Sequence, residues 1–285
     1  MILRNLMELI FPSNIYCIAC GAIIDSSRPY ALCDNCMRTF RWADGRTCDK
    51  CGKILQDTYL HDICIDCREN ERSFTKGYAC VQYGIHERDV LLSFKYGGKA
   101  YIGAKLAEIM ADRLAGEIMA DRLAGEIVAD RLTGEIVADR LTGEIVADRP
   151  AGGKLSIDLV LPVPMHKKKQ KARGFNQADI VGRRLAARLS VPYAARLLLR
   201  TKPTPAMSRL SPQERRDNME GVFAVAPGGP GRVAGKDILL VDDIYTTGST
   251  ADACSKVLFA AGAASVQVIS FAAGANMMRF GSDKI

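Results

Sequence analysis

Two adjacent carboxylates, followed by hydroxyl side chains around one glycine, form the part of this sequence best suited to chemistry. Asp242 and Asp243 come directly after the apolar run 238–241, and a helical pattern begins at Ala251. The loop residues between them that carry hydroxyls or the glycine are Thr246, Thr247, Gly248, Ser249 and Thr250. A helix N-terminus presents unpaired N–H groups and a positive dipole end, which suits a phosphate. Carboxylates at the carboxyl end of a strand can accept from sugar hydroxyls or hold Mg²⁺.

The segment predicts a site for a phosphorylated sugar. The alternative is a strand–turn–helix unit capped by Ser249, with both aspartates merely solvated.

Eight of the ten cysteines form four Cys-x-x-Cys pairs, separated by 12, 11 and 12 residues. The pairs are Cys17/Cys20, Cys33/Cys36, Cys48/Cys51 and Cys64/Cys67. Two such pairs complete a closed tetrahedral Cys₄ site, so the sequence predicts two structural Zn²⁺ ions. Sequential and interleaved combinations of the pairs both fit this spacing. A disulfide scaffold or redox thiols are the alternative, which a reducing compartment disfavours.

A run of cations follows the apolar segment 157–163. Residues 166–177 read His-Lys-Lys-Lys-Gln-Lys-Ala-Arg-Gly-Phe-Asn-Gln, and the last of their five cations is Arg173. Such a run needs an anionic neighbour or open solvent, and a contact with nucleic-acid phosphates is a further alternative. Lys95 and Lys99 flank another glycine turn. We predict that Lys95 lies near the phosphorylated ligand, although surface lysines beside a turn are common.

The elements that must position these groups alternate between apolar strands and amphipathic helices. Strands are predicted at 78–83, 157–163, 238–241 and 265–271, and helices at 90–96, 178–189 and 251–261. Apolar runs of this kind suit strands buried on both faces of a parallel sheet. We therefore expect an α/β domain whose ligand site lies at the carboxyl ends of the strands.

A nine-residue repeat interrupts this pattern at residues 108–151. The unit Glu-Ile-Met/Val-Ala-Asp-Arg-Leu-Ala/Thr-Gly begins at Glu108 and recurs up to Pro150. Nine residues make about two and a half helical turns, so successive copies turn their apolar residues to opposite faces. We predict that the first copy ends a helix starting near Ile102, and that the rest is a protruding helix or a loose excursion without chemistry of its own. A coiled coil or partner-binding arm is the alternative.

The composition of the 285 residues is that of an ordinary globular protein, with 48% hydrophobic and 25% charged residues. The formal net charge of +7 is compatible with phosphate-rich ligands or nucleic acid. No segment has the ~18 unbroken apolar residues of a membrane span, and the N-terminus lacks a signal-peptide pattern. We expect a cytoplasmic protein with no transmembrane segment.

The segment Ile238–Thr250 resembles the phosphoribosyl diphosphate (PRPP) binding motif of type I phosphoribosyltransferases. Together with the cysteine pairs, Pro-Val-Pro at 162–164 and Arg-Gly-Phe-Asn-Gln at 173–177, it resembles the ComF family. That family joins an N-terminal zinc-binding module to a phosphoribosyltransferase domain. The resemblance implies a double zinc-binding module at 1–75. It also implies a type I phosphoribosyltransferase-like parallel sheet flanked by helices at 76–285, with the repeat inserted at about 108–151.

The resemblance also implies roles for individual residues. Asp242 and Asp243 would be the catalytic pair that orients the ribose, and the loop 246–250 would hold the 5-phosphate. Arg173 would face the diphosphate, whose charge Mg²⁺ would help to neutralise. Met207 stands where the family usually carries Gln, so a ligand contact made by that Gln would be absent here.

Two functions are compatible with these features. The first is a Mg²⁺-dependent phosphoribosyltransferase that acts on PRPP and an unknown acceptor. The second is a non-catalytic factor for DNA uptake in natural competence, which binds single-stranded DNA, works with DNA-uptake proteins and uses the phosphoribosyltransferase fold as a scaffold.

Overall fold

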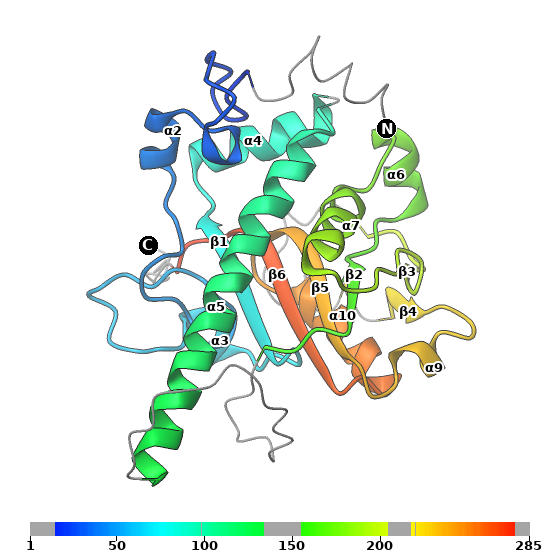
Figure 1. Cartoon of the computed structure of the whole chain (residues 1–285). Helices are drawn as coiled ribbons and strands as arrows, with labels where there is room; N and C mark the ends of the chain where they lie inside the picture. Colours follow the sequence, from blue (N-terminus) through cyan, green and yellow to red (C-terminus); the bar gives the residue numbers. More distant parts are fainter. Residues whose placement is uncertain (1–14, 98, 134–154, 205–217, 220, 277–285) are drawn as a thin grey trace, which may run out of the picture.

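Four parallel strands form the centre of the structure (Figure 1). The computed structural model describes residues 15–97, 99–133, 155–204, 218–219 and 221–276, with the side chains of 121–133 left out. The strands, in spatial order, are β1 (Lys76–Gln82), β6 (Ser265–Ala273), β5 (Asp237–Tyr245) and β2 (Leu159–Pro162). All three neighbouring pairs are parallel. The predicted class, a parallel sheet flanked by helices after a Cys-rich module, is confirmed.

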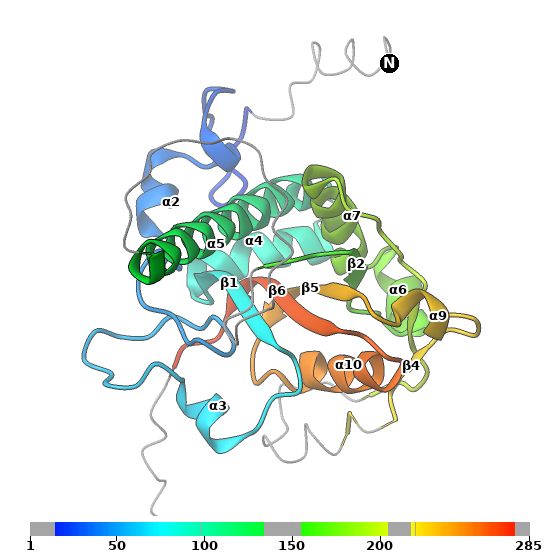
Figure 2. The ribbon, with the colours of Figure 1, turned by 60° about the horizontal axis from the view of Figure 1, so that its bottom comes forward.

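Helices cover both faces of this sheet (Figure 2). On one face lie α4 (Ile85–Tyr96), α5 (Ile102–Thr133) and α7 (Gln177–Leu189), and on the other lies α10 (Ser249–Ala260). Because strand side chains alternate between faces, Leu239 and Val241 belong to the core beneath α5 and α7, whereas Leu240 packs with Leu258 of α10. This alternation buries β5 on both faces, as the apolar run predicted.

The neighbouring strands β2 and β5 are followed by helices on opposite faces of the sheet. After β2 the chain forms α6 (Lys167–Arg173) and α7, and after β5 it forms α10. Two short antiparallel strands, β3 (Leu198–Arg200) and β4 (Phe223–Val225), and the short helix α9 (Pro230–Val233) lie between α7 and β5 in the chain. The divergence of α7 and α10 opens a crevice at the carboxyl ends of β2 and β5, where α/β folds bind ligands.

Irregular segments are paired with both outer strands of the sheet. Beside β1, the Ala43 N–H donates to the Cys80 carbonyl (2.8 Å) and the Gln82 N–H donates to the Arg41 carbonyl (2.8 Å). Beside β2, the Val160 N–H donates to the Pro192 carbonyl (2.9 Å) and the Ala194 N–H donates to the Val160 carbonyl (3.1 Å). The segment beside β1 connects the second and third cysteine pairs.

The Cys-rich N-terminal part contains only short elements. They are the 3₁₀ turn η1 (Pro29–Ala31), α2 (Asp34–Thr39) and α3 (Ile65–Glu69). Cys80 and Cys254, predicted to be buried small residues, are 2% and 0% exposed.

Helix α5, which contains the start of the repeat, extends beyond the first copy. It starts at Ile102, as predicted, and continues through Gly116 to Thr133. Met110 and Leu114 of the first copy are fully buried, whereas Met119 of the second copy is 68% exposed. The second copy therefore begins the protruding helix that was one of the predicted forms. Residues 134–154 lie outside the described part of the chain.

Deletion of residues 126–143, two whole copies, is expected to leave the thermal midpoint within about 2 °C of the wild type. The eighteen deleted residues are two whole copies, so the deletion keeps the register of the repeat. The buried part of α5 is also untouched. For comparison, Met110→Ala removes a buried side chain and should cost about 2–5 kcal/mol. Thermal unfolding measures the stability of both variants. If the deletion destabilises the protein as much as Met110→Ala does, the later copies pack on the domain.

Candidate functional site

The acidic pair lies within β5 rather than after it. The sequence pattern placed the end of this strand at Val241, but β5 continues to Tyr245 because Asp242 and Tyr245 still pair with β6 at Ser270 and Ala273. The carboxylates are therefore attached to a hydrogen-bonded strand end. A strand fixes their positions more closely than a loop would.

The two carboxylates have different partners. Asp243 forms an ion pair with Lys95 at the end of α4, so the structure brings that predicted ligand residue to the acidic pair. Asp242 accepts a hydrogen bond from the Asp243 N–H (2.8 Å). Burial raises the pKa of Asp242 well above its usual range, and the neighbouring Asp243 raises it further. Such a carboxylate gains most from an incoming cation or hydroxyl donor, since its charge is poorly compensated in the free protein.

Three cations line the same cavity as the acidic pair. This cavity of about 150 Å³ lies at the carboxyl ends of β2 and β5. Its charged residues are Asp242, Asp243, Lys169, Arg173 and Arg200, and Thr250 also lines it. Partial burial and the nearby guanidiniums of Arg200 and Arg173 lower the pKa of Lys169. Mutual repulsion of this kind indicates a site that favours an anionic ligand.

Arg173 is held in place by contacts on two sides. It donates to the Tyr96 hydroxyl (2.9 Å) and to Gln177 Oε1 (3.3 Å), and its guanidinium lies 5.0 Å from the centre of the Tyr96 ring. The residues after it form a tight connection, because Gly174 has a φ of +85° and ends α6. Asn176 then donates to the Val163 carbonyl (3.0 Å) and accepts from the Ala178 N–H (3.2 Å), which caps α7. The Arg-Gly-Phe-Asn-Gln segment thus fixes a cation above the crevice.

The hydroxyl loop forms the N-terminus of α10. Gly248 is its N-cap residue with a φ of +79°, and no side chain caps the helix there, so the alternative of a Ser249 cap is not what the structure has. The hydroxyls of Thr247 and Ser249 lie 3.1 Å apart. Thr246, Thr247, Gly248, Ser249 and Thr250 all line a small cavity of about 40 Å³ that they share with Asp242. The uncapped N–H groups are available to a phosphate.

Two residues of this region were missed by sequence reasoning. Arg200 ends β3, and its Nε is buried without a hydrogen-bond partner among the described residues. Tyr245, the last residue of β5, is 4% exposed, and its hydroxyl likewise has no partner in the described part of the chain. The only sequence signal for either residue is its place at the carboxyl end of a strand. Met207, where the sequence departs from the ComF pattern, lies outside the described residues.

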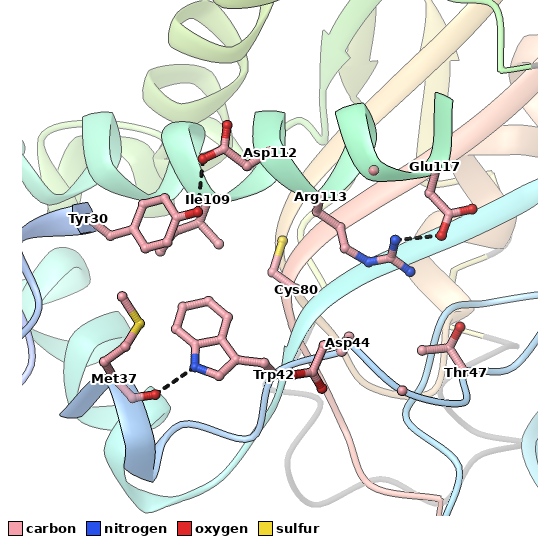
Figure 3. A pocket seen from close by; sticks show the side chains of 13 residues that line it. Tyr30, Met37, Trp42, Asp44, Thr47, Cys80, Ile109, Asp112, Arg113 and Glu117 are labelled. Atoms are coloured by element: carbon pink, nitrogen blue, oxygen red, sulfur yellow. Dashed lines mark hydrogen bonds and ion pairs between the residues drawn. The ribbon is translucent and has the colours of Figure 1, made fainter. Parts of the chain in front are cut away.

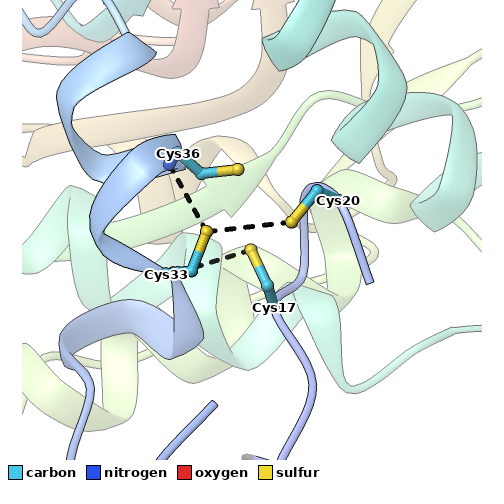
Figure 4. Close-up of side chains that lie close together, drawn as sticks. All are labelled: Cys17, Cys20, Cys33 and Cys36. Atoms are coloured by element: carbon cyan, nitrogen blue, oxygen red, sulfur yellow. Dashed lines mark hydrogen bonds between the residues drawn. The ribbon is translucent and has the colours of Figure 1, made fainter. Parts of the chain in front are cut away.

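The cysteines gather into two separate clusters by sequential pairing. One contains Cys17, Cys20, Cys33 and Cys36 (Figure 4), and the other contains Cys48, Cys51, Cys64 and Cys67. The distance from Cys20 Sγ to Cys33 Sγ is 3.7 Å, and that from Cys51 Sγ to Cys64 Sγ is 3.6 Å. Sulfurs bound to one tetrahedral Zn²⁺ are about 3.8 Å apart, since each Zn–S bond is about 2.3 Å. Both donor sets fit structural zinc, and interleaved pairing is excluded for these residues.

A larger cavity lies between the Cys-rich part and α5 (Figure 3). Its volume is about 710 Å³, and Trp42, Asp112, Arg113 and Glu117 are among its lining residues. Asp112 accepts from the Tyr30 hydroxyl (2.9 Å), and Arg113 forms an ion pair with Glu117 (2.5 Å). The cavity contains none of the predicted ligand residues, and its charges are mainly acidic, so it does not suit a phosphorylated ligand.

The described helices include none that is long and apolar enough to cross a membrane.

Comparisons with known proteins agree with this arrangement. Residues 6–68 match the family model of the double zinc ribbon domain. The chain is 27% identical to competence protein F of Haemophilus influenzae over 256 residues, which cover 90% of this chain and 95% of that protein. It is 33% identical to the DNA utilization protein YhgH of Escherichia coli O157:H7 over 111 residues, which cover 39% of this chain and 47% of the relative.

Among solved structures, part of the chain matches the glutamine PRPP amidotransferase of B. subtilis, complexed with ADP and GMP. The match covers 41% of this chain and 23% of that chain, with 20% identity and a TM-score of 0.28.

Proposed function

We propose that this chain, which belongs to the ComF family, binds PRPP at the carboxyl ends of β2 and β5 and transfers its phosphoribosyl group to an acceptor. One observation carries the proposal: Asp242, Asp243, Arg173 and Thr250 all line one cavity. Carboxylates for a ribose diol, cations for a diphosphate and hydroxyls for a monophosphate are thus combined at one crevice. PRPP contains all three groups.

Each part of the cavity has a place in this reaction. The carboxylates of Asp242 and Asp243 accept from the ribose hydroxyls, and the N-terminus of α10 with the loop 246–250 binds the 5-phosphate. Arg173, Lys169 and Arg200 face the diphosphate. An acceptor nitrogen attacks C1, the bond from C1 to the diphosphate oxygen breaks, and the acceptor loses a proton. The protein's contribution is positioning and electrostatic stabilisation of the leaving group.

Asp242 and Asp243 are also the residues that would hold Mg²⁺. Oxygen ligands on one or two carboxylates, completed by phosphate oxygens, are the usual set for this ion. Bound Mg²⁺ would neutralise charge on the leaving diphosphate. Because the pKa of Asp242 is raised, its affinity for a cation should fall as the pH decreases toward that raised pKa, where the carboxyl binds a proton instead.

Titration calorimetry with PRPP and Mg²⁺ tests the proposal. The wild type should bind, and Asp243→Asn should bind at least about 10-fold more weakly, because an amide accepts less strongly and loses the charge that holds a cation. Asp89→Asn makes the same change at an exposed site on α4 and should bind like the wild type. Absence of PRPP binding by the wild type, or equal affinity of the Asp243 variant, would contradict the proposal.

A role in DNA uptake is the second candidate, favoured by the names of the relatives and by the exposed lysines of α6. Lys167, Lys168 and Lys171 are all exposed on this helix. Lysines on one short helix can follow the phosphates of a single strand with little sequence preference. This function needs no turnover at the acidic pair, and it is compatible with PRPP binding.

Replacement of Lys167, Lys168 and Lys171 by alanine is expected to weaken binding of an oligothymidine strand and to reduce its salt dependence. Each lost phosphate contact lowers the slope of log K against log salt by about 0.7, so three contacts change it by about 2. The matched control replaces Arg196, Arg232 and Lys236, three exposed cations away from α6. Fluorescence anisotropy at several salt concentrations measures both slopes. Equal slopes for the two triple variants would exclude α6 as the contact.

A further inference from the structure

The two cysteine clusters differ in how they are attached to the α/β domain. Cys48, Cys51 and Cys64 of the second cluster are 0–1% exposed and share a hydrophobic core with Leu240 and Tyr245 of β5. In the first cluster, Cys20 is exposed, and the buried Cys17 and Cys36 belong to the other core, which contains residues of α5 together with Leu239 and Val241 of β5. The second cluster, in contrast, shares its core with Tyr245 and Ala251, the residues that flank the hydroxyl loop.

The turn after Cys51 packs directly against β1. Gly52 has a φ of +74°, and a Cβ at this position would come within 2.7 Å of the Gly77 carbonyl oxygen. The Gly77 N–H donates to the Lys50 carbonyl (2.8 Å). Backbone meets backbone here, so the turn cannot shift without loss of this contact.

A chain of contacts leads from this cluster to the hydroxyl loop. The segment 72–74 follows α3, and its Ser73 N–H donates to Asp252 Oδ1 in the first turn of α10 (2.7 Å). The next residue, Phe74, is fully buried and meets the Tyr245 ring edge-on at 6.1 Å between centroids. Tyr245 in turn lies directly against Gly248, because a Cβ there would come within 2.2 Å of the Tyr245 hydroxyl. Phe74 shares a buried core with Cys48, Cys51 and Cys64, and each later step from Phe74 or Ser73 to the loop is a direct contact.

Buried cations accompany the second cluster. Lys53 is 2% exposed, forms an ion pair with Asp66 (2.5 Å) and lies 5.9 Å from the centre of the Tyr245 ring. Arg72 is 6% exposed and donates to the Asp66 carbonyl (3.3 Å). A zinc ion with four thiolates carries a net negative charge, which such cations compensate at short range. Without the metal complex, the positive charges of Lys53 and Arg72 would be less compensated. Lys53 lies beside the Tyr245 ring, which contacts Gly248.

We propose that the second Cys₄ site positions the ligand-binding loop, so that metal at Cys48, Cys51, Cys64 and Cys67 sets the affinity for the phosphorylated ligand, whereas metal at the first site does not. The inference rests on the proposed PRPP site. Phe74 and Tyr245 are the positioning residues that connect the two. The first site packs near α5, and no comparable chain of contacts runs from it to the loop among the described residues.

A pair of cysteine variants tests this asymmetry. Cys64→Ser and Cys20→Ser each remove one ligand, from the second and first cluster respectively. Elemental analysis should find one zinc fewer per chain in each variant. Calorimetry should then show PRPP affinity lowered at least about 10-fold in Cys64→Ser and changed by less than about twofold in Cys20→Ser. Equal affinities in the two variants would overturn the inference.

Hydrogen exchange provides a readout that does not depend on PRPP. Amides of residues 246–252 should exchange at least about 10-fold faster in Cys64→Ser than in the wild type, and at the wild-type rate in Cys20→Ser. If the wild type fails to bind PRPP while this exchange pattern is found, the proposed function is wrong and the coupling stands. Unchanged exchange in a folded, zinc-depleted Cys64→Ser would overturn the coupling itself.

Phe74→Leu tests the connection without touching a metal ligand. This variant should keep two zinc ions, yet show faster exchange at 246–252 and PRPP affinity at least about fivefold lower, because the ring contact with Tyr245 is lost. If Cys64→Ser does not fold, Phe74→Leu still tests whether the contact between Phe74 and Tyr245 positions the loop. Wild-type exchange and affinity in Phe74→Leu would refute the contact chain.

Discussion

Substitution of Gly248 by alanine is expected to lower the affinity for PRPP at least about 100-fold and to destabilise the fold. The backbone at Gly248 has a φ of +79°, which costs a residue with a Cβ about 1–3 kcal/mol. The new methyl group would also lie 2.2 Å from the Tyr245 hydroxyl, so either the loop or the tyrosine must move. A moved loop would no longer direct the N–H groups of α10 at the 5-phosphate of the proposed ligand. Calorimetry with PRPP and thermal unfolding measure the two effects.

Gly231→Ala is the matched control for this variant. Gly231 lies in α9 with an ordinary backbone conformation, and a Cβ there meets nothing within 4 Å. Its affinity should equal that of the wild type, and its stability should be equal or up to about 1 kcal/mol higher, because alanine favours a helix over glycine. If Gly248→Ala behaves like Gly231→Ala, the loop does not require its left-handed conformation for binding.

Substitution of Arg200 by alanine should separate binding from stability. A hydrogen bond to a charged group contributes about 1.5–3 kcal/mol, so the loss of one contact to the diphosphate should weaken PRPP binding roughly 30-fold. The free energy of unfolding should change by less than about 1 kcal/mol. The lost stacking on Phe223 (5.5 Å to its centroid) is offset by removal of a buried Nε without a partner among the described residues.

Arg196→Ala controls for net charge, since Arg196 precedes β3 and is exposed. It should leave PRPP affinity within about twofold of the wild-type value. If Arg200→Ala instead destabilises the protein and leaves affinity unchanged, Arg200 supports the fold and does not contact the diphosphate. Calorimetry and denaturant unfolding on the same preparations distinguish these outcomes.

Local patterns in the sequence predicted much of this arrangement. The apolar runs predicted buried parallel strands, and the cysteine spacing predicted two Cys₄ clusters. The hydroxyl loop predicted the N-terminus of α10. Each of these signals lies within a few residues of the feature that it describes, so backbone geometry and side-chain periodicity suffice to interpret it.

Contacts between distant residues were harder to predict. The glycine turn after Lys95 predicted that this lysine lies near the ligand, but no local signal indicated its ion pair with Asp243, which depends on where the end of α4 meets β5. Arg200 reaches the cavity only because β3 ends beside the crevice. The pairing of the cysteines was likewise open, since identical turns combine equally well in either order until the rest of the chain is packed. The sequence predicted that β5 ends at Val241, whereas it ends at Tyr245, because adjacent carboxylates such as Asp242 and Asp243 are untypical of a strand interior.

The segment beside β1 has a consequence for solubility. An unpaired sheet edge is a template for association with other chains, and here residues 41–43 occupy that position along β1. These residues connect Cys36 of one cluster to Cys48 of the other, so both ends of the covering segment are fixed by metal sites. Zinc-depleted chains would release this cover and expose a buried, apolar strand. Aggregation by strand addition, rather than simple unfolding, is therefore the expected fate of the protein in a cell starved of zinc.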